Sequence, residues 1–290
     1  MLPFIKGPES SVGLPVQSQS ATLLRQELSA RNAAYATLNQ LSHVVSYGES
    51  PVVVYEQSDC GLKHGNFIPV SYRAILKNSE WRRRLEKVHS QGKYVLPKKE
   101  GVWRELDAST SSDALLMNIF CYPGVTRKRA LAALLGIEIG DIPQFGFRPR
   151  LDLITGAIER TEVDMKLGNV LFEAKLTESD FQTQAAKVVE RYSILDSVFE
   201  LQELPRQGQS YVSYQLLRKV LVADGLNAHF CVLLDARRSD LVEQWYRIMR
   251  CVRAVDLRTR CKLLTWQELA GAVPTALQTF LAEKYGIIAA

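Results

Sequence analysis

Three charged side chains, Asp164, Glu173 and Lys175, lie close together in a segment that otherwise has the pattern of a β-hairpin, TEVDMKLGNVLFEAKL at residues 161–176. Two carboxylates at close range repel each other unless a cation lies between them, and carboxylate oxygens are preferred ligands of Mg²⁺. An ammonium group beside such a cation can orient a water molecule, help to deprotonate it, or neutralise charge on a phosphoryl oxygen. This combination is typical of a metal-assisted hydrolytic site.

A two-residue turn at Leu167-Gly168 would place the three charged side chains on one face of the hairpin. Side chains alternate across a strand, so the apolar side chains of the second strand then point to the other face. In this register Asp164 and Glu173 are diagonal neighbours, with Cβ atoms somewhat less than about 7–8 Å apart. Glu162 would lie opposite Glu173, as a candidate extra ligand or water-orienting base. An odd-length turn would move Asp164 to the opposite face.

The elements around the hairpin must hold these side chains in place. Apolar residues recur at steps of three and four from residue 178 to 199, which predicts a long amphipathic helix, with Thr177 and Asp180 able to form a capping box. Ser112 and Asp113 offer capping chemistry for an earlier helix. The other predicted elements are helices at 112–122, 126–135, 210–225 and 239–252, strands at about 147–154, 158–166, 169–175, 227–235 and 261–266, and two short C-terminal helices.

The order of these elements predicts a mixed α/β fold, in which a mixed β-sheet is flanked by helices. Ahead of it, residues 21–46 predict a helix with Ser20 as its N-cap, 51–57 a strand and 69–89 a basic helical stretch. We therefore expect a flexible tail at 1–20, a mostly helical N-terminal extension at 21–109, and a main domain at 110–290.

Positive charge is concentrated in one part of the extension. The net charge of the chain is +5, but residues 72–99 alone carry nine Lys or Arg against two Glu. A basic segment with interleaved aromatic residues suits a phosphate-tracking surface, because Lys and Arg gain by releasing counterions from a polyanion. A solvated helix face is the alternative. The candidate nucleic-acid contacts are Arg73, Lys77, Arg82, Arg83, Arg84 and Lys87.

The composition of the 290 residues is that of an ordinary globular protein, with 47% hydrophobic and 23% charged residues. Five cysteines without CxxC spacing predict reduced thiols. The chain lacks a run of eighteen apolar residues and a signal-peptide pattern, so we expect a cytoplasmic protein with no membrane partner.

The motif EVD, followed after a short hairpin by FEAK, resembles the PD-(D/E)XK nuclease superfamily with its restriction-endonuclease-like core. Three further stretches, HGNFIPVSYRAIL, SSDALLMNIF and AKLTESDFQ, are similar to a bacterial group of restriction-endonuclease-like proteins within it. The resemblance implies that Asp164 and Glu173 hold Mg²⁺ or Mn²⁺, with the Ala174 carbonyl as a possible further ligand. It implies that Lys175 acts on the attacking water.

The sequence departs from the family pattern at several points. Val163 stands where many members have Pro before the Asp, and the first core helix offers Asp113 near its cap or Asn118 in its middle as an accessory residue. Gln184 stands near a position where relatives carry a Gln that contacts DNA or the site.

The resemblance implies a Mg²⁺-dependent endonuclease that hydrolyses phosphodiester bonds, with DNA as partner and a homodimer as a possible assembly. One alternative is a catalytically inactive nuclease fold that binds nucleic acid or a protein. Another is a scaffold in which Asp164, Glu173 and Lys175 form only an ion-pair network.

Overall fold

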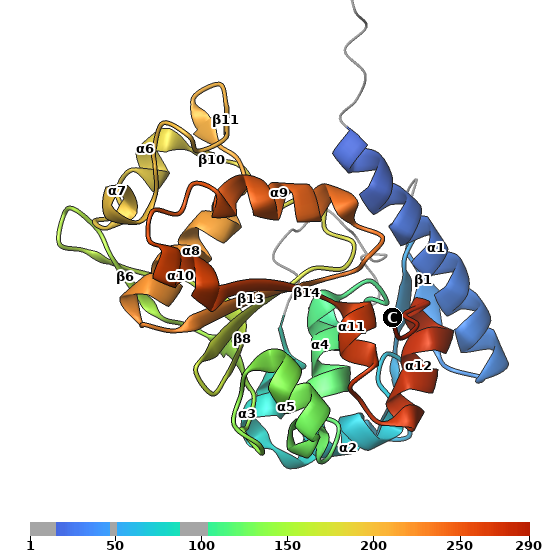
Figure 1. The fold of residues 1–290 in the computed structure, drawn as a ribbon. Helices are drawn as coiled ribbons and strands as arrows, with labels where there is room; N and C mark the ends of the chain where they lie inside the picture. Colours follow the sequence, from blue (N-terminus) through green and yellow to red (C-terminus); the bar gives the residue numbers. More distant parts are fainter. Residues whose placement is uncertain (1–15, 47–50, 88–103) are drawn as a thin grey trace, which may run out of the picture.

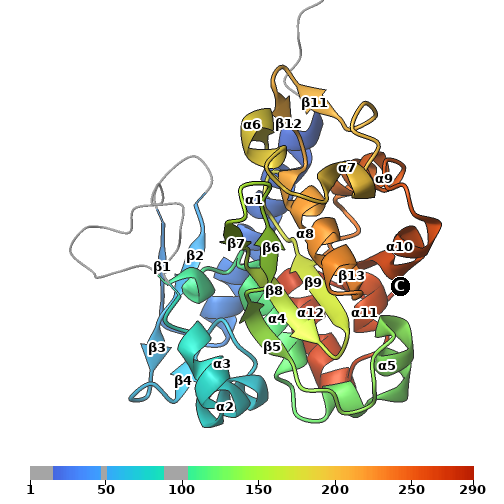
Figure 2. The ribbon, with the colours of Figure 1, turned by 90° about the vertical axis from the view of Figure 1, so that its left-hand side faces the viewer.

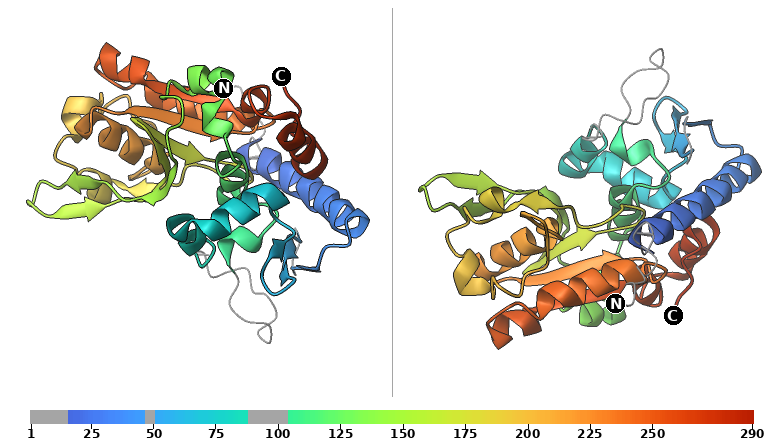
Figure 3. Two further views of the ribbon diagram at one scale, coloured as in Figure 1. Left: turned by 90° about the horizontal axis from the view of Figure 1, so that it is seen from below. Right: turned by 90° about the horizontal axis from the view of Figure 1, so that it is seen from above.

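The computed structural model describes residues 16–46, 51–87 and 104–290 (Figure 1). Its centre is a five-stranded sheet in the order β14-β13-β9-β8-β5, with helices on both sides (Figure 3). The strands are β1 (His43–Val45), β2 (Val53–Tyr55), β3 (Gln57–Ser58), β4 (Lys63–His64), β5 (Gln144–Phe147), β6 (Arg150–Asp152), β7 (Ile158–Arg160), β8 (Val163–Leu167), β9 (Val170–Ala174), β10 (Gln184–Ala185), β11 (Arg206–Gln207), β12 (Ser210–Tyr211), β13 (His229–Leu234) and β14 (Cys261–Thr265). The mixed α/β class predicted from the sequence is confirmed.

The helices come from all parts of the described chain. They are α1 (Val16–Leu38), α2 (Pro69–Lys77), α3 (Ser79–Arg84), α4 (Ser112–Phe120), α5 (Arg129–Leu135), α6 (Ala186–Val189), α7 (Leu195–Val198), α8 (Tyr214–Gly225), α9 (Ser239–Met249), α10 (Val255–Arg260), α11 (Trp266–Ala270) and α12 (Thr275–Tyr285), with 3₁₀ turns η1 (Glu105–Asp107) and η2 (Val125–Arg127). Within the described ranges, no helix combines the length and the apolar character needed to cross a membrane.

The central sheet is mixed because β8 is antiparallel to both β9 and β5, whereas β13 is parallel to β9 and to β14. Parallel strands need crossover connections, and α8 and α10 lie in those that lead to β13 and β14. A sheet that is covered by helices on both faces takes apolar residues on both sides of its strands. All five residues of β9 are accordingly buried, including Glu173.

Two hydrophobic cores lie on opposite faces of the sheet. One contains Leu171 with residues of α8, α9 and α10, and the other contains Phe172 with residues of α4, α5, α11 and α12. Helix α1 belongs to the second core through Leu24 and Leu28. Leu171 and Phe172 are consecutive, so the alternation of side chains along β9 separates the cores. The domain boundary that we placed at residue 110 stays a prediction.

Several predicted elements have other bounds. Helix α1 begins at Val16 and ends at Leu38, so Ser20 lies inside it, and the chain then enters strand β1. Residues 1–15 of the predicted tail lie outside the described chain. At α4 the N-cap is Ser111, whose hydroxyl accepts a hydrogen bond from the Ala114 N–H, and not Ser112 or Asp113.

The predicted long helix at 178–199 is wrong. Gln182 has a φ of +63°, which an α-helix does not admit, and β10 then pairs with β12. Tyr192 and Phe199 are buried in the first core, as the apolar spacing required, but Tyr192 lies between the short helices α6 and α7 and Phe199 directly follows α7. The side-chain pattern predicted burial correctly and the backbone incorrectly.

The three successive strands predicted at 147–154, 158–166 and 169–175 are also more broken than we expected. The first two predicted strands are divided among β5, β6, β7 and β8. Strands β6 and β7 pair only with each other, as a two-stranded ribbon beside β8 and β9 (Figure 2).

Candidate active site

The hairpin β8–β9 turns at Gly168-Asn169, one residue later than predicted, because Leu167 pairs with Val170. Gly168 has a φ of +56°, which suits a glycine in a two-residue hairpin turn. The turn still has two residues, so the predicted face of each side chain is kept. Extending the ladder from Met165 opposite Phe172 places Asp164 directly opposite Glu173, not diagonal to it. Glu162 therefore does not face Glu173.

Asp164, Glu173 and Lys175 come together on the sheet face that carries α8. The backbone N–H of Ala174 donates a 2.8 Å hydrogen bond to Oδ2 of Asp164, which ties the end of β9 to that carboxylate. Lys175 Nζ lies 3.0 Å from Oε1 of Glu173. Glu173 and Lys175 are 2% and 5% exposed, so this ion pair is buried.

Sequence reasoning missed a second lysine at the site. Lys219 of α8 is buried, and its Nζ lies 3.4 Å from Oε2 of Glu173, so each oxygen of this carboxylate has its own ammonium partner. The same Nζ donates to the backbone carbonyl of Glu162. Lys219 lies between apolar residues in the sequence of α8. A lysine on the buried face of a helix needs a charged or polar partner, so this position could have been predicted to belong to a buried site.

The electrostatics differ between the two carboxylates. Burial, together with the nearby charges of Glu173 and Asp113, raises the pKa of Asp164 to about 8. Burial would also raise the pKa of Glu173, but Lys175 and Lys219 outweigh it and hold that pKa below its usual value. Burial opposes the charge of Lys175 too, yet Glu173 and further carboxylates raise its pKa. Glu173 and Lys175 are thus a charged pair, whereas Asp164 forms no ion pair with any residue that the structure describes.

Asp113, on the first core helix, provides another carboxylate next to this cluster. It is 4% exposed and accepts from Arg84 at 2.7 Å and from Lys87 at 2.9 Å. Burial works against its charge, but these two cations keep the pKa of Asp113 lowered. Lys87 also contacts Glu105, where burial and the charge of Asp113 raise the pKa to about 7.

Glu162 belongs to the same ion-pair network and does not face Asp164 or Glu173. Its carboxylate is 2.7 Å from Arg84 and 3.0 Å from Arg148. Partial burial acts against ionisation, but Arg84 above all lowers the pKa of Glu162 to about 2. The structure therefore gives Glu162 a fixed negative charge that holds Arg84.

Neither amide expected at the site reaches it. Asn118 is fully buried, accepts from the Ile68 N–H, and donates to the carbonyls of Asn66 and Ala114. Gln184 accepts from the neighbouring backbone N–H of Ala185 and does not line the cavity described next. Both residues have local structural roles.

The cluster opens into a cavity of about 440 Å³ at the ends of β8 and β9. Two other amides, Gln182 and Gln215, line it. The remaining lining residues are Arg25, Val52, Lys87, Glu105, Ala108, Thr110, Ser111, Ser112, Asp113, Asp164, Glu173, Ala174, Lys175, Thr177, Glu178, Ser179 and Asp180. Most of this surface is polar or charged, which suits a hydrated, ionic ligand.

The segment that follows Lys175 is held by buried donors. Arg238, fully buried, donates to the carbonyls of Leu176, Glu178 and Ser179. Trp266 Nε1 donates to the Lys175 carbonyl at 2.9 Å. These bonds fix the backbone on which the Lys175 ammonium is placed.

The basic candidates fall into two groups. Arg84 and Lys87 are internal ion-pair partners, as described above, and are not free for a polyanion. Arg73, Lys77, Arg82 and Arg83 are exposed, with Arg83 paired to Glu80. The further lysines at 93, 98 and 99 lie outside the described residues.

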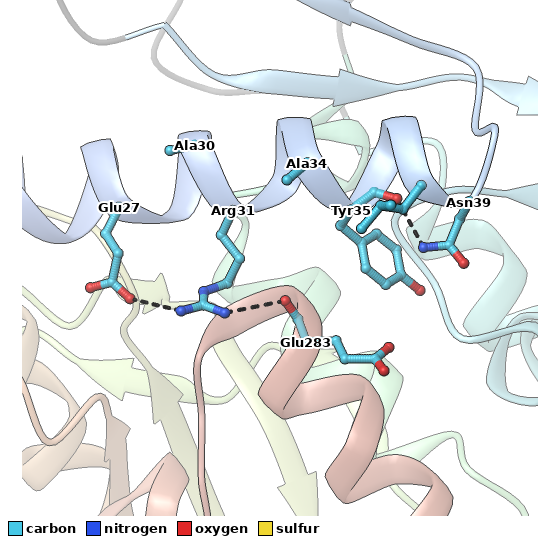
Figure 4. A pocket seen from close by; sticks show the side chains of 8 residues that line it. Glu27, Ala30, Arg31, Ala34, Tyr35, Asn39 and Glu283 are labelled. Carbon is cyan, nitrogen blue, oxygen red and sulfur yellow. Dashed lines mark hydrogen bonds and ion pairs between the residues drawn. The ribbon is translucent and has the colours of Figure 1, made fainter.

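A larger hollow, of about 710 Å³, lies between α1 and α12 (Figure 4). Two of its charged residues are paired with each other, since Arg31 contacts the Glu27 carboxylate at 3.5 Å, and Arg31 also donates to the Glu283 backbone carbonyl. It lacks the opposed carboxylates of the smaller cavity, so the smaller cavity is the candidate site.

The cavity contains carboxylate and backbone oxygens of the kind that bind a divalent cation. In the described part of the chain, no group of three or more His, Cys, Asp or Glu is spaced to hold a metal ion by itself. The donors at hand are the two carboxylates of Asp164 and Glu173 and the Ala174 backbone. Burial first, and then the charges of Glu173 and Asp113, raise the pKa of Asp164, and a bound cation would offset these effects in place of a proton.

Comparison with known proteins gives one family. The family model described as restriction endonuclease associating with ARP matches residues 31–286, which include every residue of the cluster. No curated protein matches the chain, and no solved structure matches it. The match agrees with the resemblance that the sequence motif indicates.

Proposed function

The chain belongs to the family of restriction endonucleases associating with ARP, and from this premise we propose that it hydrolyses phosphodiester bonds in DNA with the help of Mg²⁺ or Mn²⁺. The observation that carries the proposal is the position of Asp164 opposite Glu173, with Lys175 paired to Glu173. All three line one polar cavity. Opposed carboxylates with an adjacent ammonium suit hydrolysis of a charged ester.

Asp164 and Glu173 are the residues that would hold the cation, with the Ala174 carbonyl as a further candidate. When bound, the cation supplies Lewis-acid chemistry to the phosphate and makes water a better nucleophile. Asp164 is kept in place for this role by the N–H of Ala174. Glu173 is oriented by its two lysines.

Lys175 acts as a cation at neutral pH, because its pKa is raised by the carboxylates around it. An ammonium is a donor and not a base. It can therefore orient the attacking water through a hydrogen bond and stabilise the negative charge that develops on the phosphate oxygens. The buried bonds of Arg238 and Trp266 hold the adjacent backbone during this step.

Lys219 is a positioning residue in this proposal. It contacts the Glu173 carboxylate and the backbone carbonyl of Glu162, and so links α8 to β9 and to the residue that precedes β8. The exposed residues Arg73, Lys77, Arg82 and Arg83 stay candidates for contacts to the DNA backbone.

The test is cleavage of supercoiled plasmid by the purified protein with Mg²⁺ or Mn²⁺. We expect nicked or linear product with the wild type and none with Glu173→Ala. Glu243→Ala is the matched control, because Glu243 is an exposed carboxylate that is 57% accessible and, among the described residues, pairs with Arg247 alone. Equal cleavage by wild type and Glu173→Ala, or none by either over a wide range of conditions, would refute the proposal.

A second candidate is a nuclease fold without turnover. It is favoured by one observation, that both oxygens of Glu173 already have ammonium partners. Salt-dependent DNA binding that is unaffected by Asp164→Asn, without cleavage, would support this candidate.

A further inference from the structure

The ribbon β6–β7 has two different faces. Its register pairs Arg150 with Arg160 and Asp152 with Ile158, so these four side chains share one face, the outer face. All four are exposed. The other face carries Leu151, which is 4% exposed and belongs to the core that contains α8. The ribbon is thus packed on one side and open on the other.

The inner face is firmly attached to the protein. Leu153 forms a β-bridge with Tyr192, whose hydroxyl donates a 2.9 Å hydrogen bond to the Glu159 carboxylate. Arg218 and Arg191 also lie within 4 Å of that carboxylate. These contacts neutralise the one acid of the inner face and fix the ribbon against α8, so its outer face is preorganised.

The outer face places two like charges side by side. Directly opposite residues on paired strands have Cβ atoms about 4.5–5.5 Å apart, and like charges at that distance are destabilising. Within the described residues, neither Arg150 nor Arg160 has an ion pair or a side-chain hydrogen bond. Arg148, by contrast, is paired with Glu162. An exposed arginine pair whose guanidinium groups are not engaged in ion pairs is complementary to closely spaced phosphates.

The arginine pair is close to the candidate active site along the chain. Arg160 precedes Asp164 by four residues, and four residues span at most about 14 Å. Duplex DNA rises about 3.4 Å per base pair, so this reach corresponds to about four base pairs. A strand held at the cavity would therefore have phosphates within range of the ribbon.

We infer that the outer face of β6–β7 holds the phosphate backbone of duplex DNA within about four base pairs of the bond to be cleaved. Arg150 and Arg160 contact adjacent phosphates. Ile154 and Ile158, which are 70% and 49% exposed, lie toward the tip of the ribbon. A two-stranded ribbon is narrow enough to enter a major groove. Asp152 shares the outer face and lies between Arg150 and the tip of the ribbon. The attraction for phosphate is therefore centred on Arg150 and Arg160, at the end of the ribbon away from the tip.

This inference rests on the proposed nuclease function, and the experiment separates the two. Binding of a fluorescent 24-base-pair duplex is followed by anisotropy in EDTA over a range of salt concentrations, and cleavage is followed in Mg²⁺. The variant is Arg150→Ala/Arg160→Ala. The matched control is Arg127→Ala/Arg129→Ala, which removes two exposed arginines at η2 and α5. Arg150→Lys/Arg160→Lys keeps the charge.

The ribbon variant is expected to bind the duplex at least about tenfold more weakly at low salt, while the control binds like wild type. The slope of log binding constant against log salt concentration should be shallower by about 1.8 in this variant, since each of the two lost phosphate contacts contributes about 0.9 to the slope. The lysine variant should keep the wild-type slope. If the ribbon variant binds and cleaves like the control, the inference is wrong and the nuclease proposal stands. Ribbon-dependent binding without any cleavage would support the inference and refute the nuclease proposal.

Discussion

Lys219 Nζ lies 3.4 Å from Oε2 of Glu173, on the carboxylate oxygen that Lys175 does not occupy. In the proposed reaction this second ammonium opposes the cation that Glu173 would hold, because like charges repel in a buried site. Replacing Lys219 with Met should therefore tighten Mn²⁺ binding by about tenfold or more. Cleavage should slow, because Glu173 loses one of the two groups that orient it. Titration calorimetry with Mn²⁺ and a plasmid assay measure the two effects.

Lys219→Arg and Lys187→Met serve as controls for this experiment. The first keeps the charge at the site, and the second removes an exposed lysine from α6. Both should leave Mn²⁺ affinity near the wild-type value. An unchanged affinity in Lys219→Met would show that Lys219 does not act on the cation site.

Arg84 holds two carboxylates, Asp113 and Glu162, at 2.7 Å each, and its side chain is 10% exposed. Arg84→Ala would leave both carboxylates without this partner. Removing one partner of a buried ion pair costs about 3–5 kcal/mol, and we expect a loss of unfolding free energy of that order in urea denaturation. The neighbouring Arg83 is the control, because its side chain is 73% exposed. Arg83→Ala should change the unfolding free energy by less than about 0.5 kcal/mol, and an equal loss in both variants would contradict this account.

Lys284 of α12 is fully buried and has no ion pair within the described chain. Its Nζ donates to the Gly65 carbonyl and lies 3.7 Å from the centroid of the Tyr55 ring. The ring favours the ammonium, but burial dominates and lowers the pKa of Lys284 well below its usual value. Lys284→Met should therefore raise the free energy of unfolding at pH 7 by about 1 kcal/mol or more.

The same substitution has a defined pH dependence. The unfolded chain keeps the Lys284 proton up to its ordinary pKa, near about 10.4, whereas the folded chain releases it at lower pH. The unfolded state thus binds more protons between these values, and wild-type stability rises with pH relative to the variant. Denaturation at pH 7 and pH 10 should show the advantage of Lys284→Met shrinking. A constant advantage would mean that folded Lys284 keeps its proton up to pH 10 as the unfolded chain does, and would contradict a lowered pKa.

The sequence was enough to predict that Asp164, Glu173 and Lys175 share one face of the hairpin. Whether residues on two paired strands share a face depends only on whether the turn between them has an even or an odd number of residues. Moving the turn by one residue changed the partner of Asp164 without changing its face. The roles of Lys219 and Arg84 were not predictable in this way, because they depend on contacts between residues far apart in the sequence. Lys219 is 46 positions from Glu173, and Arg84 is 29 positions from Asp113. Such pairings are set by how helices pack on the sheet.

The helix that we predicted at 178–199 failed for a related reason. Periodic apolar residues report which side chains are buried, not which backbone presents them. Phe181 and Val189 are both fully buried, yet Gln182 adopts a left-handed φ between them. The strand β12, far along the chain, provides the hydrogen bonds that draw residues 184 and 185 out of a helix.

The most direct test of the central claim is a crystal of the protein soaked in Mn²⁺ and examined by anomalous diffraction. The account predicts a peak between the carboxylates of Asp164 and Glu173, within ordinary coordination distance of both. The same soak of Asp164→Asn should give a weaker peak or none. A Mn²⁺ peak elsewhere in a protein that cleaves DNA, with no density between these carboxylates, would contradict the account.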